Sequence, residues 1–280
     1  MKKGLVLEGG GMRGVFTCGV LDYLLEKNIK FEYVIGVSAG ALNATRFLSN
    51  QPKKGFEVSL KYLNNKDYCS IYSLIKTGNI FGHSMLFDKI PFQLDPLDND
   101  YFKKSKVEFN CVATNCLTGK PTYFKITDFK KDMHYLKASS SLPLLSTMIN
   151  IDNNYYLDGG LSDSIPVKEA INSGCNKVVV IMTQPKDYRK KQNNLYKPMK
   201  YKYKDYPGIV NAARIRHEVY NETLDYLYEE EKKGNIFIIQ PDTSLGIKRT
   251  DKNKERLTSG YNAGYNKAKE IYEDLIKYLK

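Results

Sequence analysis

Short apolar runs alternate with longer amphipathic stretches along the chain, and this rhythm predicts strands that alternate with helices. The runs over residues 4–8, 31–35 and 177–182 are rich in aliphatic and β-branched side chains, which is typical of strands in a buried sheet. Small side chains over 39–44 open a helix, and a proline and a glycine bracket another over 166–174. The pattern predicts an α/β fold with helices on both faces of a sheet.

The other predicted elements continue this rhythm, and no repeat or low-complexity segment interrupts it. In chain order they are helices and loops over 53–105, strands over 107–114, 121–126 and 155–157, a helix over 208–233, a strand over 236–239 and a helix to residue 280. We expect a single domain over 1–280, with its main motifs in 4–165 and a helix–strand–helix region over 207–280.

Composition adds expectations about size and compartment. The chain has 280 residues, of which 42% are hydrophobic, enough to bury the core of one large domain. Only four residues separate Lys3 from Glu8, too few for a signal-peptide core, and no apolar run approaches the roughly 20 residues of a membrane span. The five cysteines lack disulfide or zinc spacing, so we expect thiols in a reducing cytoplasm, with no metal and no cofactor.

The turn after the second predicted strand carries the sequence Gly36-Val37-Ser38-Ala39-Gly40. A Gly-x-Ser-x-Gly turn between a strand and a helix is typical of a nucleophile elbow, which exposes the serine hydroxyl in a strained backbone conformation. Gly36 and Gly40 keep side chains out of the tight turn. The alternative for an isolated copy is an ordinary glycine-containing turn.

A glycine-rich loop, residues 9–14, follows the first predicted strand and opens a helix. Its backbone N–H groups predict a site for negative charge at the helix N-terminus. The spacing also matches a dinucleotide-binding loop, which needs an acidic residue at the end of the second strand. Here Glu32 falls at the start of that strand, so nucleotide binding is the weaker interpretation. No Gly-Lys-Ser/Thr follows the glycines, which excludes a Walker loop.

A serine nucleophile needs a proton acceptor, and histidine is the usual one. The chain has only His83, His134 and His217. His217 would complete the order Ser, Asp, His, but it lies inside a helical pattern rather than on a loop after a late strand. Asp158 is the better partner because it follows the predicted strand 155–157 and precedes two glycines. An isolated Asp-Gly-Gly also fits a simple turn.

Together these segments resemble the patatin-like phospholipases, a family of lipid acyl hydrolases that includes bacterial members. The resemblance rests on residues 9–14, 36–40 and 158–160 in this order, and on the small-residue segment 138–143. It implies a three-layer αβα sandwich with a mostly parallel sheet. It also implies a serine–aspartate dyad without histidine.

Carried over residue by residue, the resemblance makes Ser38 the nucleophile, Asp158 the proton acceptor and Arg13 the loop arginine of the family. The residues implied around the oxyanion hole are Gly9, Gly10, Gly11, Met12, Arg13, Gly14 and Ala39. An ordinary aspartate, with a pKa of about 3.9, falls about 4 kcal/mol short of a matched base at neutral pH. Burial that raises this pKa, or strong oxyanion stabilisation, would offset the difference.

The net charge is +12, and residues 186–206 hold eight Lys and Arg against two Asp. Five tyrosines are interleaved with these charges. Lysine with tyrosine suits an anionic membrane surface, so we expect peripheral membrane contact through 186–206. The alternative is a solvated, mobile loop. No RNA- or DNA-binding motif accompanies the tract, so nucleic acid is not expected as a partner.

These observations predict a cytoplasmic lipid acyl hydrolase, peripheral at the membrane, that forms an acyl-enzyme on Ser38 from a lipid or acyl-ester substrate. A short-chain carboxylester or thioester hydrolase is the close alternative. A nucleotide-binding protein, or a binding protein that keeps the fold without catalysis, is the alternative from a different class.

Overall fold

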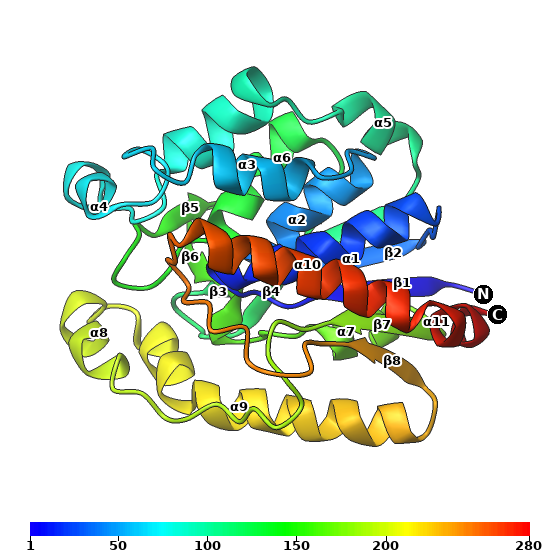
Figure 1. The fold of residues 1–280 in the computed structure, drawn as a ribbon. Coiled ribbons are helices and arrows are strands. Elements are labelled where there is room, and N and C mark those ends of the chain that lie inside the picture. The colour runs from blue at the N-terminus through cyan, green and yellow to red at the C-terminus, as the bar shows by residue number, and fades with distance from the viewer.

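Eight strands form one sheet at the centre of the computed structural model, which describes residues 1–280 (Figure 1). In spatial order they are β5 (Ile149–Ile151), β6 (Asn154–Asp158), β3 (Glu108–Asn115), β2 (Tyr33–Val37), β1 (Lys3–Leu7), β7 (Lys177–Ile181) and β8 (Ile236–Ile239), with β4 (Pro121–Ile126) paired to β3. The five neighbouring strands β3, β2, β1, β7 and β8 are parallel to one another. Strands β4, β5 and β6 are antiparallel to the strands they pair with. The mostly parallel sheet is confirmed.

Helices cover both faces of this sheet and complete the predicted αβα sandwich (Figure 1). In chain order they are α1 (Val15–Glu26), α2 (Ala39–Leu48), α3 (Lys54–Lys61), α4 (Ile71–Thr77), a π-helical segment (Ser84–Leu94), α5 (Asn99–Lys104), α6 (Phe129–Ser139), α7 (Val167–Asn172), α8 (Tyr196–Lys202), α9 (Pro207–Lys232), α10 (Lys254–Glu270) and α11 (Tyr272–Leu279). Helices α1, α2, α6, α10 and α11 pack on one face, and α7 and α9 on the other.

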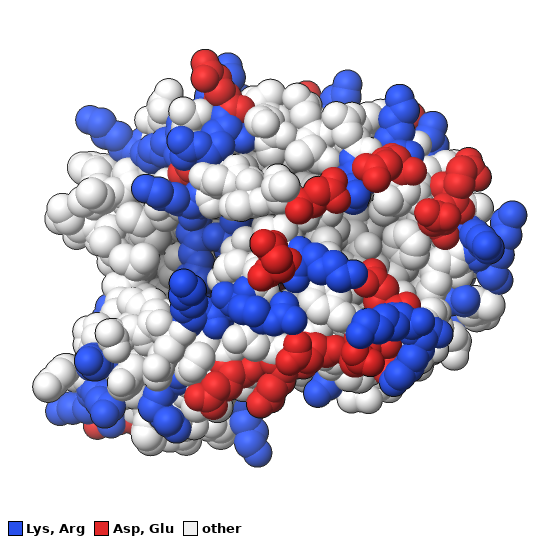
Figure 2. Space-filling view, turned by 60° about the horizontal axis from the view of Figure 1, so that its bottom comes forward, with Lys and Arg blue, Asp and Glu red and all other residues white.

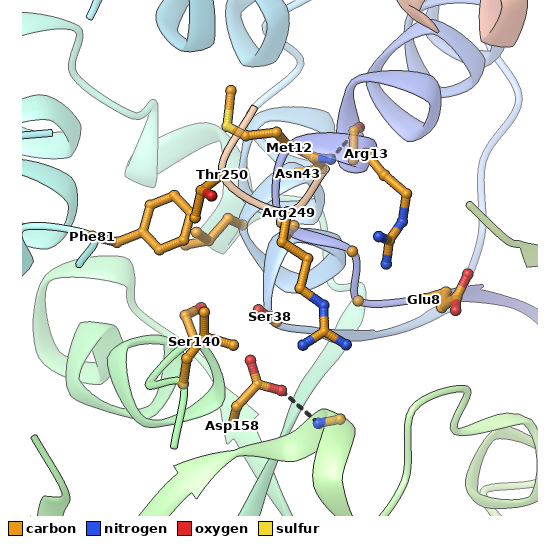
Figure 3. Close-up of a pocket in the computed structure, with 18 of the residues that line it drawn as sticks. Glu8, Met12, Arg13, Ser38, Asn43, Phe81, Ser140, Asp158, Arg249 and Thr250 are labelled. Atoms are coloured by element: carbon orange, nitrogen blue, oxygen red, sulfur yellow. Dashed lines mark hydrogen bonds between the residues drawn. The ribbon is translucent and has the colours of Figure 1, made fainter. Parts of the chain in front are cut away.

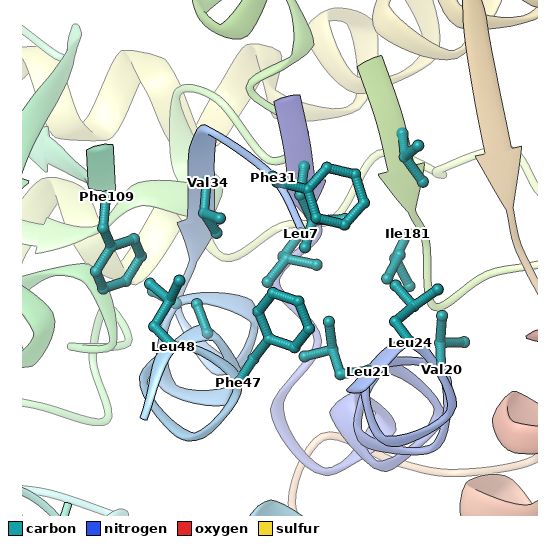
Figure 4. Packing of buried hydrophobic residues seen from close by; sticks show 14 of the residues in the cluster. Leu7, Val20, Leu21, Leu24, Phe31, Val34, Phe47, Leu48, Phe109 and Ile181 are labelled. Carbon is teal, nitrogen blue, oxygen red and sulfur yellow. The ribbon is translucent and has the colours of Figure 1, made fainter. Parts of the chain in front are cut away.

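The alternation of side chains along each strand decides which helix it contacts. In β1, Leu5 and Leu7 belong to the larger core with α1 and α2, whereas Val6 packs on the opposite face with α7 and α9. Figure 4 shows Leu7 and Ile181 above Leu24 of α1 and Phe47 of α2. Each large apolar side chain buried in this way contributes about 1.5–3 kcal/mol.

Strand register places the end of β2 beside the end of β6. Val37, the last residue of β2, pairs with Val112 of β3. The next residue of β3, Ala113, pairs with Asp158 at the end of β6. Strand β6 therefore pairs with β3 immediately beyond the point where β2 ends. Ser38, the residue after Val37, consequently lies next to Asp158.

The C-terminal region joins the same core through a close crossing of α10 and α1. A Cβ at Gly19 would lie 2.1 Å from the Tyr261 carbonyl oxygen, and one at Gly264 would lie 2.0 Å from the Phe16 carbonyl oxygen. The two helix backbones approach this closely because neither position has a side chain.

We predict that Gly264→Ala lowers the free energy of unfolding by about 1–3 kcal/mol, because the new methyl group overlaps backbone that cannot rotate away. Gly260→Ala on the same helix is the matched control, since its Cβ would meet the flexible end of Ile247. Urea unfolding of both variants measures the difference. Equal losses of stability in the two variants would contradict the backbone contact at Gly264.

Three elements differ from the sequence-based expectation. The predicted C-terminal helix is two helices, α10 and α11, separated by a turn at Ile271. The turn allows Leu275 and Leu279 of α11 to pack in the core. The basic tract contains the short helix α8, in which Pro198 lies within the first turn, where proline is tolerated. Strand β5 pairs with β6 as a hairpin at the edge of the sheet. The sequence did not predict β5, because a strand of three residues is too short to show a pattern.

No helix combines the length and the apolar composition that crossing a bilayer requires. The longest helix, α9, has 26 residues and carries charged side chains along its length.

Candidate active site

Ser38 lies in the turn between β2 and α2 with φ 52° and ψ −120°. A positive φ at a residue with a side chain costs on the order of 1–3 kcal/mol, and such strain is concentrated at functional sites. The flanking glycines permit the turn: a Cβ at Gly36 would lie 2.7 Å from the Ala41 nitrogen, and one at Gly40 would lie 2.5 Å from the Leu7 oxygen. The turn therefore presents the Ser38 side chain at the carboxyl end of the central strand β2.

Asp158 ends β6 and points toward Ser38 (Figure 3). Its Oδ1 atom accepts a hydrogen bond of 2.7 Å from the Gly160 N–H. Burial raises the pKa of the Asp158 carboxyl, while the Arg216 charge, the Gly160 N–H and the Ser38 hydroxyl each act to lower it. The net direction is upward, toward the pKa of a useful base at neutral pH.

The end of α6 holds the backbone of both residues. The Ser139 hydroxyl accepts a 2.9 Å hydrogen bond from the Ser38 N–H, and the Ser141 carbonyl accepts a 2.7 Å bond from the Asp158 N–H. Sequence reasoning noted the segment 138–143 only as part of the family resemblance. The structure gives it a physical role: it fixes the position of one candidate residue relative to the other.

The glycine-rich loop forms a 3₁₀ turn over Gly11–Gly14, and this turn uses some of the expected oxyanion donors. The Met12 N–H donates to the Arg249 carbonyl at 3.0 Å, and the Arg13 N–H donates to the Gly10 carbonyl at 3.4 Å. These two N–H groups are therefore bonded within the protein in this structure. Among the residues of the expected oxyanion hole, the backbone N–H groups of Gly9, Gly10, Gly11 and Ala39 have no hydrogen-bond partner in the protein.

The loop is pinned from the far end of the chain. Gly11 has φ 58°, and a Cβ there would lie 2.6 Å from the Arg249 carbonyl oxygen, so only glycine fits. Gly14 closes the turn, and its carbonyl accepts a 2.8 Å hydrogen bond from Asn43 of α2. The free N–H groups are thus held by contacts with α2 and with the segment before α10.

Ser38, Asp158 and the glycine-rich loop line one cavity of about 430 Å³, a volume typical of ligand pockets. Figure 2 shows a hollow between two largely uncharged lobes, with Lys and Arg side chains beside it. Apolar side chains line much of the cavity, among them Phe81, Leu86, Ile90, Met133, Leu142 and Met199. The arrangement combines a serine, a buried carboxylate, free N–H groups and an apolar pocket.

No histidine lines this cavity. His83 packs on Phe87, and burial, with the Lys137 charge, lowers its pKa to about 4. The Nδ1 atom of His134 lies 2.9 Å from the Lys131 carbonyl oxygen, and His217 lies beside Glu218 on α9. The structure brings Asp158, and none of the histidines, to Ser38.

The two acidic residues that could serve a dinucleotide-binding loop, Glu8 and Glu32, are both bound to protein groups. Glu8 is buried, where its carboxylate accepts hydrogen bonds from the Tyr220 hydroxyl at 2.7 Å and the Thr183 N–H at 2.6 Å. Glu32 accepts a 2.7 Å bond from the Lys3 N–H at the start of β1, the opposite end from the glycine-rich loop. Neither is placed to hold a ribose.

Four basic side chains that sequence reasoning missed also line the cavity: Arg46 of α2, Lys190, Arg216 and Arg249. Lys190 belongs to the basic tract, where it is one charge among eight, and nothing in the sequence marks Arg216 or Arg249. Only the topology brings these three late residues to Ser38, because Lys190 follows β7, Arg216 lies on α9 and Arg249 precedes α10.

The basic tract 186–206 is only partly a solvated surface. Lys190 faces the cavity, and Tyr203 is buried. Tyr201 on α8 is 85% exposed, and the lysines of α8 are exposed around it. The exposed part of the tract is therefore α8 and its flanks.

Comparisons with known proteins bear on the whole chain. A family model described as patatin-like phospholipase matches residues 5–171, and a second, described as a domain of unknown function, matches residues 206–280. The uncharacterised Escherichia coli protein YjjU is 30% identical over 254 residues, covering 86% of this chain and 69% of YjjU.

Two further relatives have names that state an activity. The probable lipid hydrolase 463L of Invertebrate iridescent virus 6 is 28% identical over 183 residues, covering 60% of this chain and 63% of that protein. Lysophospholipase NTE1 of Saccharomyces cerevisiae is 24% identical over 270 residues, which cover 85% of this chain but only 15% of NTE1. The crystal structure of VipD from Legionella pneumophila shares the fold, with a TM-score of 0.51 at 14% identity over 98% of this chain and 67% of VipD.

Proposed function

The chain belongs to the patatin-like phospholipase family, and from this premise we propose that it is a serine lipid acyl hydrolase of the phospholipase A type. The observation that carries the proposal is the strand register that sets Ser38 beside the buried carboxylate of Asp158 in an apolar cavity. Relatives named as lipid hydrolase and lysophospholipase support the substrate class.

In the proposed mechanism the Ser38 Oγ attacks the ester carbonyl carbon while Asp158 accepts the hydroxyl proton. The oxyanion that develops is stabilised by free N–H groups of the loop, for which Gly10 and Gly11 are the best candidates. The intermediate collapses and expels the alcohol, which takes the proton from Asp158 and leaves the acyl group on Ser38. Water then gives a proton to Asp158 and attacks the acyl-enzyme, which releases the fatty acid and returns the proton to Ser38.

We also propose that residues 1–280 act as one cytoplasmic hydrolase domain. Strand β8 extends the sheet of the N-terminal part, and the Arg249 carbonyl holds the Met12 N–H. All five cysteines are free and buried, which suits a reducing compartment.

A direct test is release of fatty acid from lysophospholipids and from p-nitrophenyl esters of graded chain length. The proposal expects hydrolysis of both, with a preference for longer chains set by the apolar cavity. Activity restricted to short esters would favour the short-chain carboxylester hydrolase. Absence of all hydrolysis in a folded protein would overturn the proposal that the protein is an enzyme.

We further propose that the protein contacts an anionic membrane through two exposed helices on one side of the molecule, α4 and α8 (Figure 1). On α4, Ile71 is 71% and Ile75 is 82% exposed, and on α8 Tyr201 stands among exposed lysines. Apolar side chains that enter the interface and lysines that face anionic head groups together favour such binding, at about 1 kcal/mol per lysine.

We predict that the protein sediments with vesicles of phosphatidylglycerol and phosphatidylcholine but not with phosphatidylcholine alone. Ile75→Ser should weaken this binding several-fold, because it removes an exposed apolar contact. Tyr101→Ser is the control, since Tyr101 is also exposed but belongs to α5, a helix that lies away from α4 and α8 (Figure 1). Binding that is indifferent to lipid charge would contradict the proposal.

A further inference from the structure

Positive charge is concentrated on one side of the cavity that holds Ser38. Arg13, Lys190, Arg216 and Arg249 all line this side, and none of them forms an ion pair with a carboxylate. In Figure 3 the guanidinium group of Arg249 extends toward Ser38 and Asp158, and that of Arg13 points to the same part of the cavity. The cavity therefore has an apolar part and a cationic part, which meet near Ser38.

Two of these residues are anchored to the candidate catalytic motifs, Arg216 through its side chain and Arg249 through its backbone. The Arg216 Nε–H donates to the Gly160 carbonyl. The position that a Cβ at Gly160 would take is 2.9 Å from Asp158 Oδ1 and 3.1 Å from Arg216 Nη2. The Arg249 carbonyl accepts the Met12 N–H, which fixes the backbone of Arg249 beside the glycine-rich loop, and its side chain lines the cavity.

Lys190 completes the cluster. Its ammonium group lies 4.0 Å from the centre of the Tyr220 ring and makes no hydrogen bond. Burial, followed by the charge of Arg216, lowers the pKa of Lys190 to about 7, and burial with the charge of Arg249 lowers the pKa of Arg216 to about 10. Like charges thus repel one another in a partly desolvated site, which is a costly arrangement.

Two carboxylates, Glu8 and Asp158, offset part of this positive charge, but neither forms an ion pair with the cluster. Glu8 is engaged by the hydroxyl of Tyr220 and by Thr183, and Asp158 is bound to the Gly160 N–H. Four basic groups against two carboxylates leave an excess of positive charge, which an anionic ligand would balance. Arginine forks match phosphate oxygens in geometry as well as in charge.

We propose that Lys190, Arg216 and Arg249 bind the head-group phosphate of the substrate, so that the enzyme prefers acylglycerol lipids with a free phosphomonoester. The inference rests on the proposed function, because it assumes that the scissile ester lies at Ser38. A phosphomonoester carries about −1.5 to −2 charges at neutral pH. A phosphocholine head group carries a single phosphate charge and adds a choline cation beside the cluster, and a neutral acylglycerol supplies no anion.

The test compares three substrates with the same oleoyl ester: 1-oleoylglycerol 3-phosphate, 1-oleoylglycero-3-phosphocholine and 1-oleoylglycerol, in the same mixed micelles. The wild-type protein should favour the phosphomonoester over the neutral lipid by about 10- to 100-fold in kcat/KM, the range for charge-assisted hydrogen bonds. Lys190→Gln and Arg249→Gln should each reduce this ratio at least several-fold. The second variant keeps the Arg249 carbonyl that holds the loop.

Lys191→Gln is the matched control, because Lys191 is adjacent in sequence but exposed. Its ratio should equal that of the wild type. The ratio separates head-group binding from a structural role, since loss of Asp158 positioning would slow all three substrates alike. A folded wild type without preference, or an unchanged ratio in both variants, would overturn the inference while leaving the hydrolase intact.

Inorganic phosphate and glycerol 3-phosphate, tested as inhibitors of p-nitrophenyl butyrate hydrolysis, distinguish a lipid head group from free phosphate. Weak inhibition by both, with strong lipid selectivity, supports head-group binding. Tight inhibition by inorganic phosphate without lipid selectivity would assign the cluster to free phosphate and overturn the proposal. A wild type that hydrolyses neither the lipids nor the p-nitrophenyl ester would overturn the proposed function, and this inference with it.

Discussion

Ser38→Ala is expected to reduce kcat/KM for ester hydrolysis on the order of 10⁴-fold or more, because it removes the atom that attacks the carbonyl. The substitution removes one hydroxyl from a small side chain and keeps the Ser38 N–H bond to Ser139. The fold should therefore remain intact, and thermal unfolding can verify this. Initial rates with p-nitrophenyl butyrate measure the loss.

His217→Ala is the control for this experiment. His217 lies on α9 beside Glu218 and does not line the cavity, so its removal should leave the rate within about two-fold of the wild type. Loss of activity in a folded His217→Ala protein would replace the dyad with a triad. Retention of full activity in Ser38→Ala would exclude Ser38 as the nucleophile.

Asp158→Asn should cause a loss on the order of 10³- to 10⁴-fold, because an amide cannot accept the serine proton. The amide is nearly isosteric, and its oxygen can still accept the Gly160 N–H. The loss should therefore appear mainly in kcat, with little change in the binding of a non-hydrolysable substrate analogue. A rate within ten-fold of the wild type would contradict the role of Asp158 as base.

The pH dependence of activity is a second test of the same assignment. Burial raises the pKa of Asp158 above the ordinary 3.8, so wild-type activity should fall with decreasing pH at a midpoint above that value. A raised pKa in the folded state means that ionisation of Asp158 costs stability as the pH increases past 3.8. Asp158→Asn removes this cost, so at pH 7 its unfolding midpoint should not be below that of the wild type.

The sequence was sufficient for features that depend on local pattern. The strands and the turn around Ser38 follow from apolar runs and from glycines two residues on either side of it. Asp158 was identified by its place after a strand and before two glycines. These signals are local because a tight turn constrains only its immediate neighbours.

Other features depend on contacts between distant segments, which no local pattern encodes. The bond from Met12 to the Arg249 carbonyl removes an expected oxyanion donor, and it requires the chain before α10 to return to the first loop. The inward position of Lys190 depends on Tyr220 of α9. Positive charge was visible in the sequence, but its division between surface and cavity required the fold.

The central claim is that Ser38 carries the acyl group during the reaction. The most direct measurement is reaction with a fluorophosphonate, followed by digestion and mass spectrometry of the peptides. We predict one adduct, on Ser38, in the wild type and in His217→Ala, with no adduct in Ser38→Ala and slow labelling in Asp158→Asn. An adduct on another residue of an active wild-type enzyme, or undiminished hydrolysis by an unlabelled protein, would contradict the account.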